Sequence, residues 1–528
     1  MKKFYSFILL GVLAVFGAAA QTGSDQLITQ RPEGRAYDNL SRSTMSYFTY
    51  LNAMLPMPTY GLQSEIVINQ EKGEFYLYNP LSRLNTETYL KGTIDAQGNV
   101  TIPTPQYIFR KVDGNVVEDY YIFRMKNEGD QKLPKFVADR ANSELKFTWK
   151  DGVLTQTDGG VLALGYIDGE CAGYADEDIK MVSVTETPVA PADPSKLDLK
   201  EYILGFTNHH DVADVVMAKM AYDGNDVWLT DFIPDMENVW LKGTTDGNSV
   251  TFTSGQLLGV CDGYYAYFYG ARRDIGENMQ GTPETIYILE PDLMFTPSSK
   301  GLLATDVVFE VNAGNGESSY LYAYSNPEII LFEDKPQVPA RPMLGQFTPA
   351  GGQFPIGMLG ITINPFNQKK GTQDVDFIDP SLLYYTIYIN DMKNPLVIKA
   401  KDFPGWIKED TSLIPCKFND GTNDGSIAMI YNYNNTTFIF NNVSWQEFGV
   451  QTIYFGGGEE RRSATVWTNG DIIPSEWDNG EVGVEGVGVD ANDEIVAYYD
   501  LMGRQVVNPE KGIYIVRTAS GKTFKVVK

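Results

Sequence analysis

The stretch Tyr89-Leu90-Lys91-Gly92-Thr93 recurs 151 residues later as Trp240-Leu241-Lys242-Gly243-Thr244. Three further pairs of segments match, with offsets between 148 and 152 residues. These pairs are Glu74-Phe75-Tyr76-Leu77 with Asp226-Val227-Trp228-Leu229, Val100-Thr101-Ile102 and Gln106 with Val250-Thr251-Phe252 and Gln256, and 145–154 with 293–303. Solenoid repeats are about 20–50 residues long. A repeat of this greater length indicates a duplicated domain.

Each copy is predicted to consist of antiparallel β-strands. Apolar and polar residues alternate in Val100 to Ile102 and in Val250 to Phe252, and turn-forming residues precede these segments at 97–99 and 246–248. Helical periodicity is scarce, and its best candidate is Asp38 to Leu55. We therefore expect an all-β chain whose two tandem related domains are meander barrels or sandwiches.

The domain boundaries follow from two proline-rich segments. Thr187 to Pro194 separates the copies, which are expected at 21–187 and 198–334, and should act as a semi-rigid linker. Lys335 to Pro342 precedes a third domain, expected at 343–475.

The third domain has the pattern of a β-sandwich. Leu382 to Ile389 predicts a strand that ends in the turn Asn390-Asp391, and Gly449 to Tyr454 with Ser463 to Trp467 predicts a closing hairpin. This combination resembles a fibronectin type III-like sandwich. The chain with its repeated WLKGT motif is also similar to uncharacterised secreted proteins of Bacteroidetes, and that resemblance implies no activity.

The amino-terminal residues have the features of a Sec signal peptide. Lys2 and Lys3 precede an apolar stretch, Phe7 to Phe16, and Ala18 and Ala20 occupy the small-residue positions before Gln21. The apolar stretch is shorter than the roughly 20 residues that cross a bilayer. We therefore expect a signal peptide at 1–20, export, and no membrane span.

The carboxyl-terminal residues predict three short strands with turns, followed by a last strand at Phe524 to Val527. The motifs YDLMGR, GIYIV and GKTFKVVK occur there in order and resemble the C-terminal sorting domain of Bacteroidetes type IX secretion cargo. The residues that carry this resemblance, within an expected tail at 484–528, are Tyr499, Asp500, Leu501, Gly503, Arg504, Gly512, Ile513, Tyr514, Lys522 and Lys525.

The resemblance implies a route and partners. The tail would engage the type IX secretion machinery and its sortase, and would be removed after passage through the outer membrane. The protein would then be released or attached to surface lipopolysaccharide. The expected location is therefore secreted or on the outer cell surface.

Composition excludes several classes of function. The chain has 42 Lys and Arg against 68 Asp and Glu, a net charge of −26, which disfavours nucleic acid and anionic membranes as partners. Two histidines exclude any site with three His ligands, and three cysteines exclude a disulfide framework. A hydrophobic share of 43% is enough for packed cores.

Local clusters give no catalytic, cofactor or metal assignment. His209-His210-Asp211 could bind zinc or copper, but adjacent histidines in a strand point to opposite faces and the chain has no third histidine, so a solvated loop is expected. Asp420 to Gly425 lacks the spacing of a calcium loop, and Gly456-Gly457-Gly458 lacks the Lys-Ser/Thr of a phosphate loop. A nucleophile would have to be one of Cys171, Cys261 and Cys416, which are far apart in sequence.

Two aromatic clusters occupy comparable places in the copies, at 120–123 and 264–269. One face of each strand should be core, and the other, if exposed, would be a platform for stacking on sugars or peptides. Packing in an ordinary β core is the favoured interpretation. The candidate platform residues are Tyr120, Tyr121, Tyr265, Tyr267 and Tyr269.

These observations favour an exported, non-catalytic binding or adhesion protein whose extracellular ligand is a glycan or a protein. The alternative is a secreted hydrolase acting on glycan or peptide, with catalytic carboxylates in a cleft between the two repeats.

Overall fold

The chain is all-β in a computed structural model. The structure describes 27–527 apart from 52, 115, 130–133, 209–211, 235, 278–280, 317–319, 351–355, 369–374, 404, 420–426, 433, 442–444, 479–494, 500–504, 507–512 and 519–522. Two compact units divide the chain, at 1–332 and 333–528. Strands dominate both units, and the only helical segments among the described residues are three-residue 3-10 turns.

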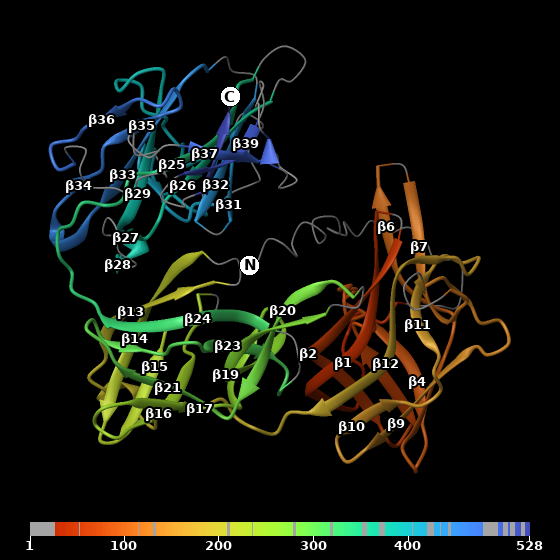
Figure 1. The fold of residues 1–528 in the computed structure, drawn as a ribbon. Coiled ribbons are helices and arrows are strands. Elements are labelled where there is room, and N and C mark those ends of the chain that lie inside the picture. Colours follow the sequence, from red (N-terminus) through yellow and green to blue (C-terminus); the bar gives the residue numbers. More distant parts are fainter. Residues whose placement is uncertain are drawn as a thin grey trace. The chain divides into compact units, whose positions relative to one another are not determined.

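The first repeat contains a closed ring of eight antiparallel strands, β1-β2-β3-β4-β5-β9-β10-β12, in which β12 returns to β1 (Figure 1). Along the same edge that pairs with β10, the long strand β12 also pairs with β11, which continues the sheet through β7 to β6 and β8. The strands are β1 (Arg35–Tyr50), β2 (Ala53–Asn69), β3 (Glu74–Tyr78), β4 (Tyr89–Ile94), β5 (Asn99–Pro103), β6 (Gln106–Asp113), β7 (Val116–Asn127), β8 (Phe136–Ala138), β9 (Glu144–Lys150), β10 (Val153–Gln156), β11 (Val161–Gly165) and β12 (Cys171–Ser183).

The second repeat has the same topology. Each strand pairing of the first repeat has a counterpart in the second. Strand β13 pairs with β14 and, closing the ring, with β24, and the branch runs from β24 through β23 to β19. This agreement confirms the duplicated domain and selects the barrel over the sandwich. The strands are β13 (Lys200–Thr207), β14 (Ala213–Asp223), β15 (Asp226–Thr230), β16 (Trp240–Thr245), β17 (Val250–Thr253), β18 (Gln256–Cys261), β19 (Tyr264–Glu277), β20 (Pro283–Glu290), β21 (Asp292–Pro297), β22 (Leu302–Leu303), β23 (Val308–Ala313) and β24 (Tyr320–Leu331).

The helical candidate Asp38 to Leu55 is wrong, because these residues belong to β1 and the start of β2. Alternate side chains of β1 point inward, but three of them, Arg42, Thr44 and Ser46, are polar and buried. A strand whose inward side chains are polar does not show the apolar alternation that identifies a strand in sequence.

Both barrels are filled by side chains. In the second barrel the Phe252 ring meets the rings of Phe268 and Phe295 edge to face, with centroids 6.2 and 6.0 Å away. In the first barrel the core is mainly aliphatic, with Leu77, Leu90 and Ile102 fully buried. Both interiors are therefore packed cores, and ligand sites must be sought on the outside.

The two repeats make direct contact within their unit. Leu62 of β2 pairs with Tyr264 of β19, and the Gln63 amide donates to the Gly263 carbonyl at 2.7 Å. Gly61 lies so close to Gly314 that an added Cβ would overlap the Gly314 nitrogen. The proline-rich linker also packs on the second repeat, where the Val189 amide donates to the Leu257 carbonyl. It is therefore a packed segment of the junction.

The second unit contains two sheets that share one core. One sheet has the order β25-β26-β32-β31 and the other β30-β29-β33-β35-β36. When the strands are lettered in chain order, the first sheet has the order A-B-E-D, and β29, β33 and β35 of the second sheet are C, F and G. This is the arrangement of an immunoglobulin-like sandwich. The fibronectin type III assignment stays a prediction. The strands are β25 (Met343–Thr348), β26 (Ile356–Thr362), β29 (Leu383–Ile389), β30 (Ile414–Pro415), β31 (Ile427–Asn432), β32 (Asn435–Asn441), β33 (Phe448–Tyr454), β35 (Thr465–Trp467) and β36 (Ile472–Ile473).

The carboxyl-terminal residues form a four-stranded sheet in the order β38-β37-β39-β40. Its strands are β37 (Ile495–Tyr499), β38 (Gln505–Val506), β39 (Ile513–Thr518) and β40 (Thr523–Val527), close to the predicted positions. The segment predicted as a signal peptide lies outside the described residues. None of the helical segments that the structure describes has the length and apolar character to cross a bilayer.

Candidate functional site

The predicted aromatic platform is not an open surface. Tyr265 and Tyr267 are only 6% and 2% exposed and pack with Leu257 and with Val184, which directly follows β12. The Tyr267 hydroxyl donates to Glu186 at 3.1 Å, and burial together with this carboxylate raises the pKa of Tyr267. The segment between β12 and the linker therefore covers the face of β19 that carries Tyr265 and Tyr267. This contact is distant in sequence, so the pattern of β19 alone does not predict it.

The other platform residues also have partners. The Tyr269 hydroxyl donates to Asn315 at 2.5 Å. Tyr120 is buried and stacks on Phe109 with ring centroids 4.6 Å apart. Tyr121 is half-buried, and its ring lies 5.4 Å from that of Tyr107. Aromatic packing within each repeat accounts for these contacts.

Some of the remaining candidate site residues from the sequence lie among the described residues, and others lie outside them. Gly456 to Gly458 form a 3-10 turn, and the Gly457 amide donates to Asp334 at 2.5 Å. The three cysteines are free thiols, and in the part of the chain that the structure describes no group of three His, Cys, Asp or Glu could hold a metal ion. The segments His209 to Asp211 and Asp420 to Gly425 lie outside the described residues.

Some residues of the predicted sorting motif lie among the described residues, and others lie outside them. Tyr499, Ile513, Tyr514 and Lys525 lie in strands β37, β39 and β40. Those outside the described residues are Asp500, Leu501, Gly503, Arg504, Gly512 and Lys522.

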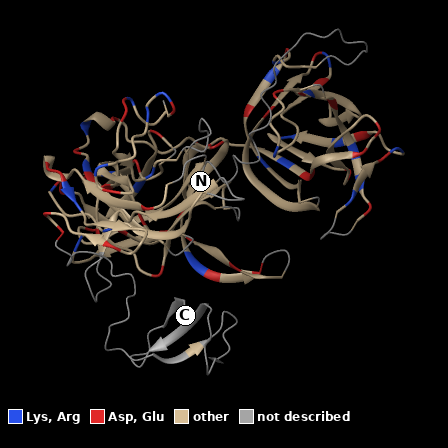
Figure 2. Ribbon diagram, turned by 90° about the horizontal axis from the view of Figure 1, so that it is seen from above, with Lys and Arg blue, Asp and Glu red and all other residues tan. Residues whose placement is uncertain are grey.

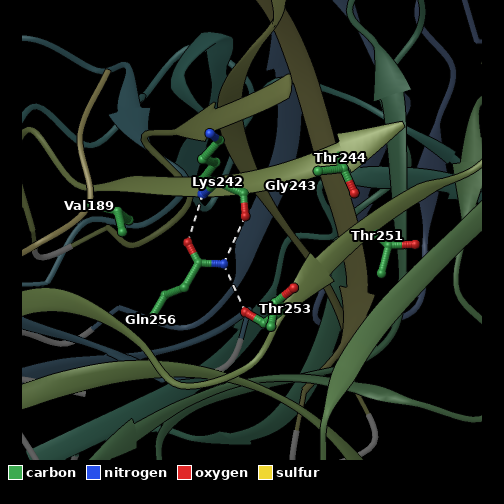
Figure 3. Close-up of a pocket in the computed structure, with 7 residues that line it drawn as sticks. All are labelled: Val189, Lys242, Gly243, Thr244, Thr251, Thr253 and Gln256. Carbon is green, nitrogen blue, oxygen red and sulfur yellow. Dashed lines mark hydrogen bonds between the residues drawn. The ribbon is translucent and has the colours of Figure 1, made fainter. Parts of the chain in front are cut away.

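A hollow of about 260 Å³ lies on the outside of the second barrel, where β16, β17 and β18 meet the linker (Figure 3). Most of its lining belongs to the motif that defines the repeat. The lining residues are Val189, Lys242, Gly243, Thr244, Thr251, Thr253 and Gln256.

Gln256 determines the local backbone of the hollow. Its Oε1 accepts from the Lys242 amide at 2.9 Å, and its Nε2 donates to the carbonyls of Lys242 and Thr253, each at 2.8 Å (Figure 3). Strand β17 ends at Thr253. Beyond that point the Gln256 side chain, in place of a strand, bonds the backbone amide and carbonyl of Lys242 in β16. Gln106 makes the same three bonds, to Lys91 and Pro103. This role explains the glutamine in both repeats.

A charged and aromatic wall adjoins the hollow. The Lys242 ammonium lies 2.7 Å from Asp226 and 5.4 Å from the centre of the Trp228 ring. Trp240, on the same face of β16 as Lys242, is half-buried, and its ring meets Trp228 edge to face at 6.3 Å. The wall therefore combines two indole rings with an ammonium whose charge is balanced by its carboxylate partner.

In the first repeat the position of Trp240 is covered, whereas Lys91, at the position of Lys242, is exposed. Tyr89, at the position of Trp240, is only 6% exposed, and its amide donates to the Ile28 carbonyl at 2.9 Å. Arg31 holds the same amino-terminal segment in place through Glu65 at 2.6 Å. In the second repeat the shared motif thus lines a hollow, and Trp240 is less covered there than Tyr89 is in the first.

Comparison with known proteins gives no relative. No family model, no curated protein and no solved structure matches the chain. The repeated Lys, Gly, Thr and Gln were visible in the sequence, where they indicated that the two copies are related. The sequence did not predict that they line a hollow.

Proposed function

We propose that the chain is an exported, surface-displayed or released binding protein, and that the hollow beside Lys242 takes a hydroxyl-rich glycan. The observation that carries the glycan is the lining, which combines three threonines with a lysine whose ammonium lies 5.4 Å from the centre of the Trp228 ring. Export rests on the signal-like and tail-like sequences at the two ends.

The lining chemistry suits a sugar ring. Threonine hydroxyls both donate and accept hydrogen bonds, as sugar hydroxyls do, and the face of an indole ring offers apolar contact to the C–H groups of a sugar. Because Asp226 balances Lys242, the hollow does not need an anionic ligand. Since Gln256 holds the strands in place, little order has to be created on binding.

A glycan array followed by calorimetry on the full chain tests the binding site. Replacing Lys242 by Ala should weaken binding of a captured glycan at least about tenfold, a loss of roughly 1.4 kcal/mol. Lys91→Ala removes the matching exposed lysine from the first repeat, where Tyr76 and Tyr89 stand in place of Trp228 and Trp240, and should leave the affinity unchanged. Equal loss in both variants, or no captured glycan, would contradict the site, and cleavage of the glycan would instead support a hydrolase.

Deleting Glu494 to Lys528 tests the proposed route. In cells with type IX secretion, we expect the truncated chain to accumulate in the periplasm while the full chain reaches the surface or medium. Cell fractionation with antibody detection measures this. Normal surface delivery of the truncated chain would rule out the sorting role.

A further inference from the structure

The outer face of the sheet β25-β26-β32-β31 carries no charged residue on its described strands. The inner face packs in the core of the sandwich, and the alternate residues of the outer face are only Ala, Gly, Ile, Met, Thr, Asn and Gln. Among them Ile356, Met358 and Met343 are 51%, 43% and 38% exposed. Elsewhere in the chain, basic and acidic residues are interspersed over the strands (Figure 2). An uncharged, partly apolar sheet face of this kind marks a contact surface.

The carboxyl-terminal sheet β38-β37-β39-β40, here called the tail sheet, has one face of matching character. Its strand register assigns to that face the positions Tyr498, Val506, Tyr514, Val516, Phe524 and Val526. The basic residues Arg517 and Lys525 belong to positions of the opposite face. A sheet with one apolar face has to bury it against another layer. The tail sheet therefore needs a partner surface.

The chain leaves the sandwich beside the outer face. Asp478 is fully buried, and its carboxylate lies 2.7 Å from the Nη2 of Arg341, two residues before β25 begins. The Ala464 amide also donates to Asp478 at 2.8 Å, so this point of exit is fixed. Sixteen residues, 479–494, separate it from β37. An extended chain of that length reaches roughly 50 Å, so the tail sheet is tethered within reach of the outer face.

The two parts carry net charges of opposite sign. Residues 495–528 contain six Lys and Arg against two Asp and Glu, whereas 343–478 contain nine against fifteen. Contact between the tail sheet and the sandwich is therefore electrostatically favoured, while contact between the sandwiches of two copies would bring like charges together. Charge thus favours the tail sheet over a second copy as the layer that covers the outer face.

We propose that the tail sheet docks on the outer face of β25-β26-β32-β31 in the same chain. Both sheets have four strands, so they would stack face to face about 10 Å apart, as the layers of a β-sandwich do. Each layer would cover the uncharged face of the other. Removal of the tail, which rests on the proposed export route, would leave the outer face free to bind a partner.

Oxidation of methionines by hydrogen peroxide, followed by mass spectrometry of the full chain, tests the docking. We expect Met343 and Met358 to oxidise several-fold more slowly than Met294, a residue 53% exposed in the first unit. Val516→Lys introduces a charge at a position of the apolar face of the tail sheet and should raise both rates to that of Met294. Ile515→Lys, at the neighbouring position on the opposite face, is the control and should leave both rates low.

Two results would overturn the docking. Met343 and Met358 of the native chain could oxidise as fast as Met294, which would show that the outer face is open. Their protection could instead survive Val516→Lys, which would show that another layer covers it. Protection that grows with protein concentration would identify a second copy as the cover and exclude the contact within the chain.

Trypsin cleavage after Arg517 gives a second measurement, from the side of the tail sheet. Docking stabilises the tail sheet, so cleavage of the native chain should be slow, because it requires local opening. Ile356→Asp on the outer face should accelerate cleavage, whereas Ile473→Asp, at similar exposure on the other sheet of the sandwich, should not. An unchanged thermal unfolding midpoint verifies the fold of each variant. Equal cleavage of the native chain and Ile356→Asp would show that the tail sheet does not use this face.

Discussion

Replacing Glu310 by Gln is expected to stabilise the unit of two barrels at pH 8 by up to roughly 3 kcal/mol. Glu310 lies on β23, is 2% exposed, and accepts one hydrogen bond, from the Asn312 amide nitrogen at 2.9 Å. Its other oxygen has no partner. Burial therefore raises the pKa of Glu310 to about 7, from 4.5 in the unfolded chain.

The sign of the pH dependence follows from this raised pKa. Between pH 4.5 and about 7 the folded state holds a proton that the unfolded state releases. The contribution of Glu310 to stability is therefore fully present below pH 4.5 and is lost as pH rises through 7. Glutamine carries no ionisable proton, so the variant should lack this loss.

Unfolding by urea at several pH values, with hydrogen exchange to assign the transition to the first unit, measures the effect. The difference between native chain and variant should grow with pH across this window. Glu284→Gln, an exposed substitution in the same repeat, is the control and should leave the curve unchanged. A flat difference for Glu310→Gln would show that its carboxyl is not held protonated.

Replacing Asp176 by Ala should destabilise the first repeat by about 3–5 kcal/mol, because it leaves a buried guanidinium without its counter-ion. Arg42 is fully buried, and its Nη2 lies 2.5 Å from Asp176 and 2.6 Å from the Pro80 carbonyl. Asp176 also accepts from the amide and hydroxyl of Ser82, at 2.8 and 2.9 Å. One residue thus neutralises the arginine and fixes the 79–88 loop.

The second repeat supplies the control for this prediction. Register places Leu204 at the position of Arg42 and Tyr324 at that of Asp176. The double variant Arg42→Leu, Asp176→Tyr should therefore lose less stability than Asp176→Ala, since no charge remains buried. Hydrogen exchange in β1 and β12 reports on the first repeat alone. A double variant that is less stable than the single one would show that the pair contributes more than charge balance.

The sequence predicted those features that depend on local pattern. Matching segments located equivalent strands, and glycines such as Gly98 and Gly247 do occupy turns with positive φ. The β1 strand was missed because Arg42 and Ser46 occupy inward positions, where only the buried network with Asp176 satisfies them. The tyrosines of β19 pack in the core, the interpretation that the sequence favoured, but the sequence could not show what covers them. Val184, which lies 81 residues before Tyr265, packs against them.

Ring closure between the first and last strands also constrains how each barrel can form. Because β1 pairs with β12, and β13 with β24, neither ring can close before its whole sequence is available. Such long sequence separation makes folding slow, since the entropy of a long loop is lost before the closing contacts form. Under the proposed export, the chain would gain from this delay, because the closing strand of each barrel would cross the inner membrane last.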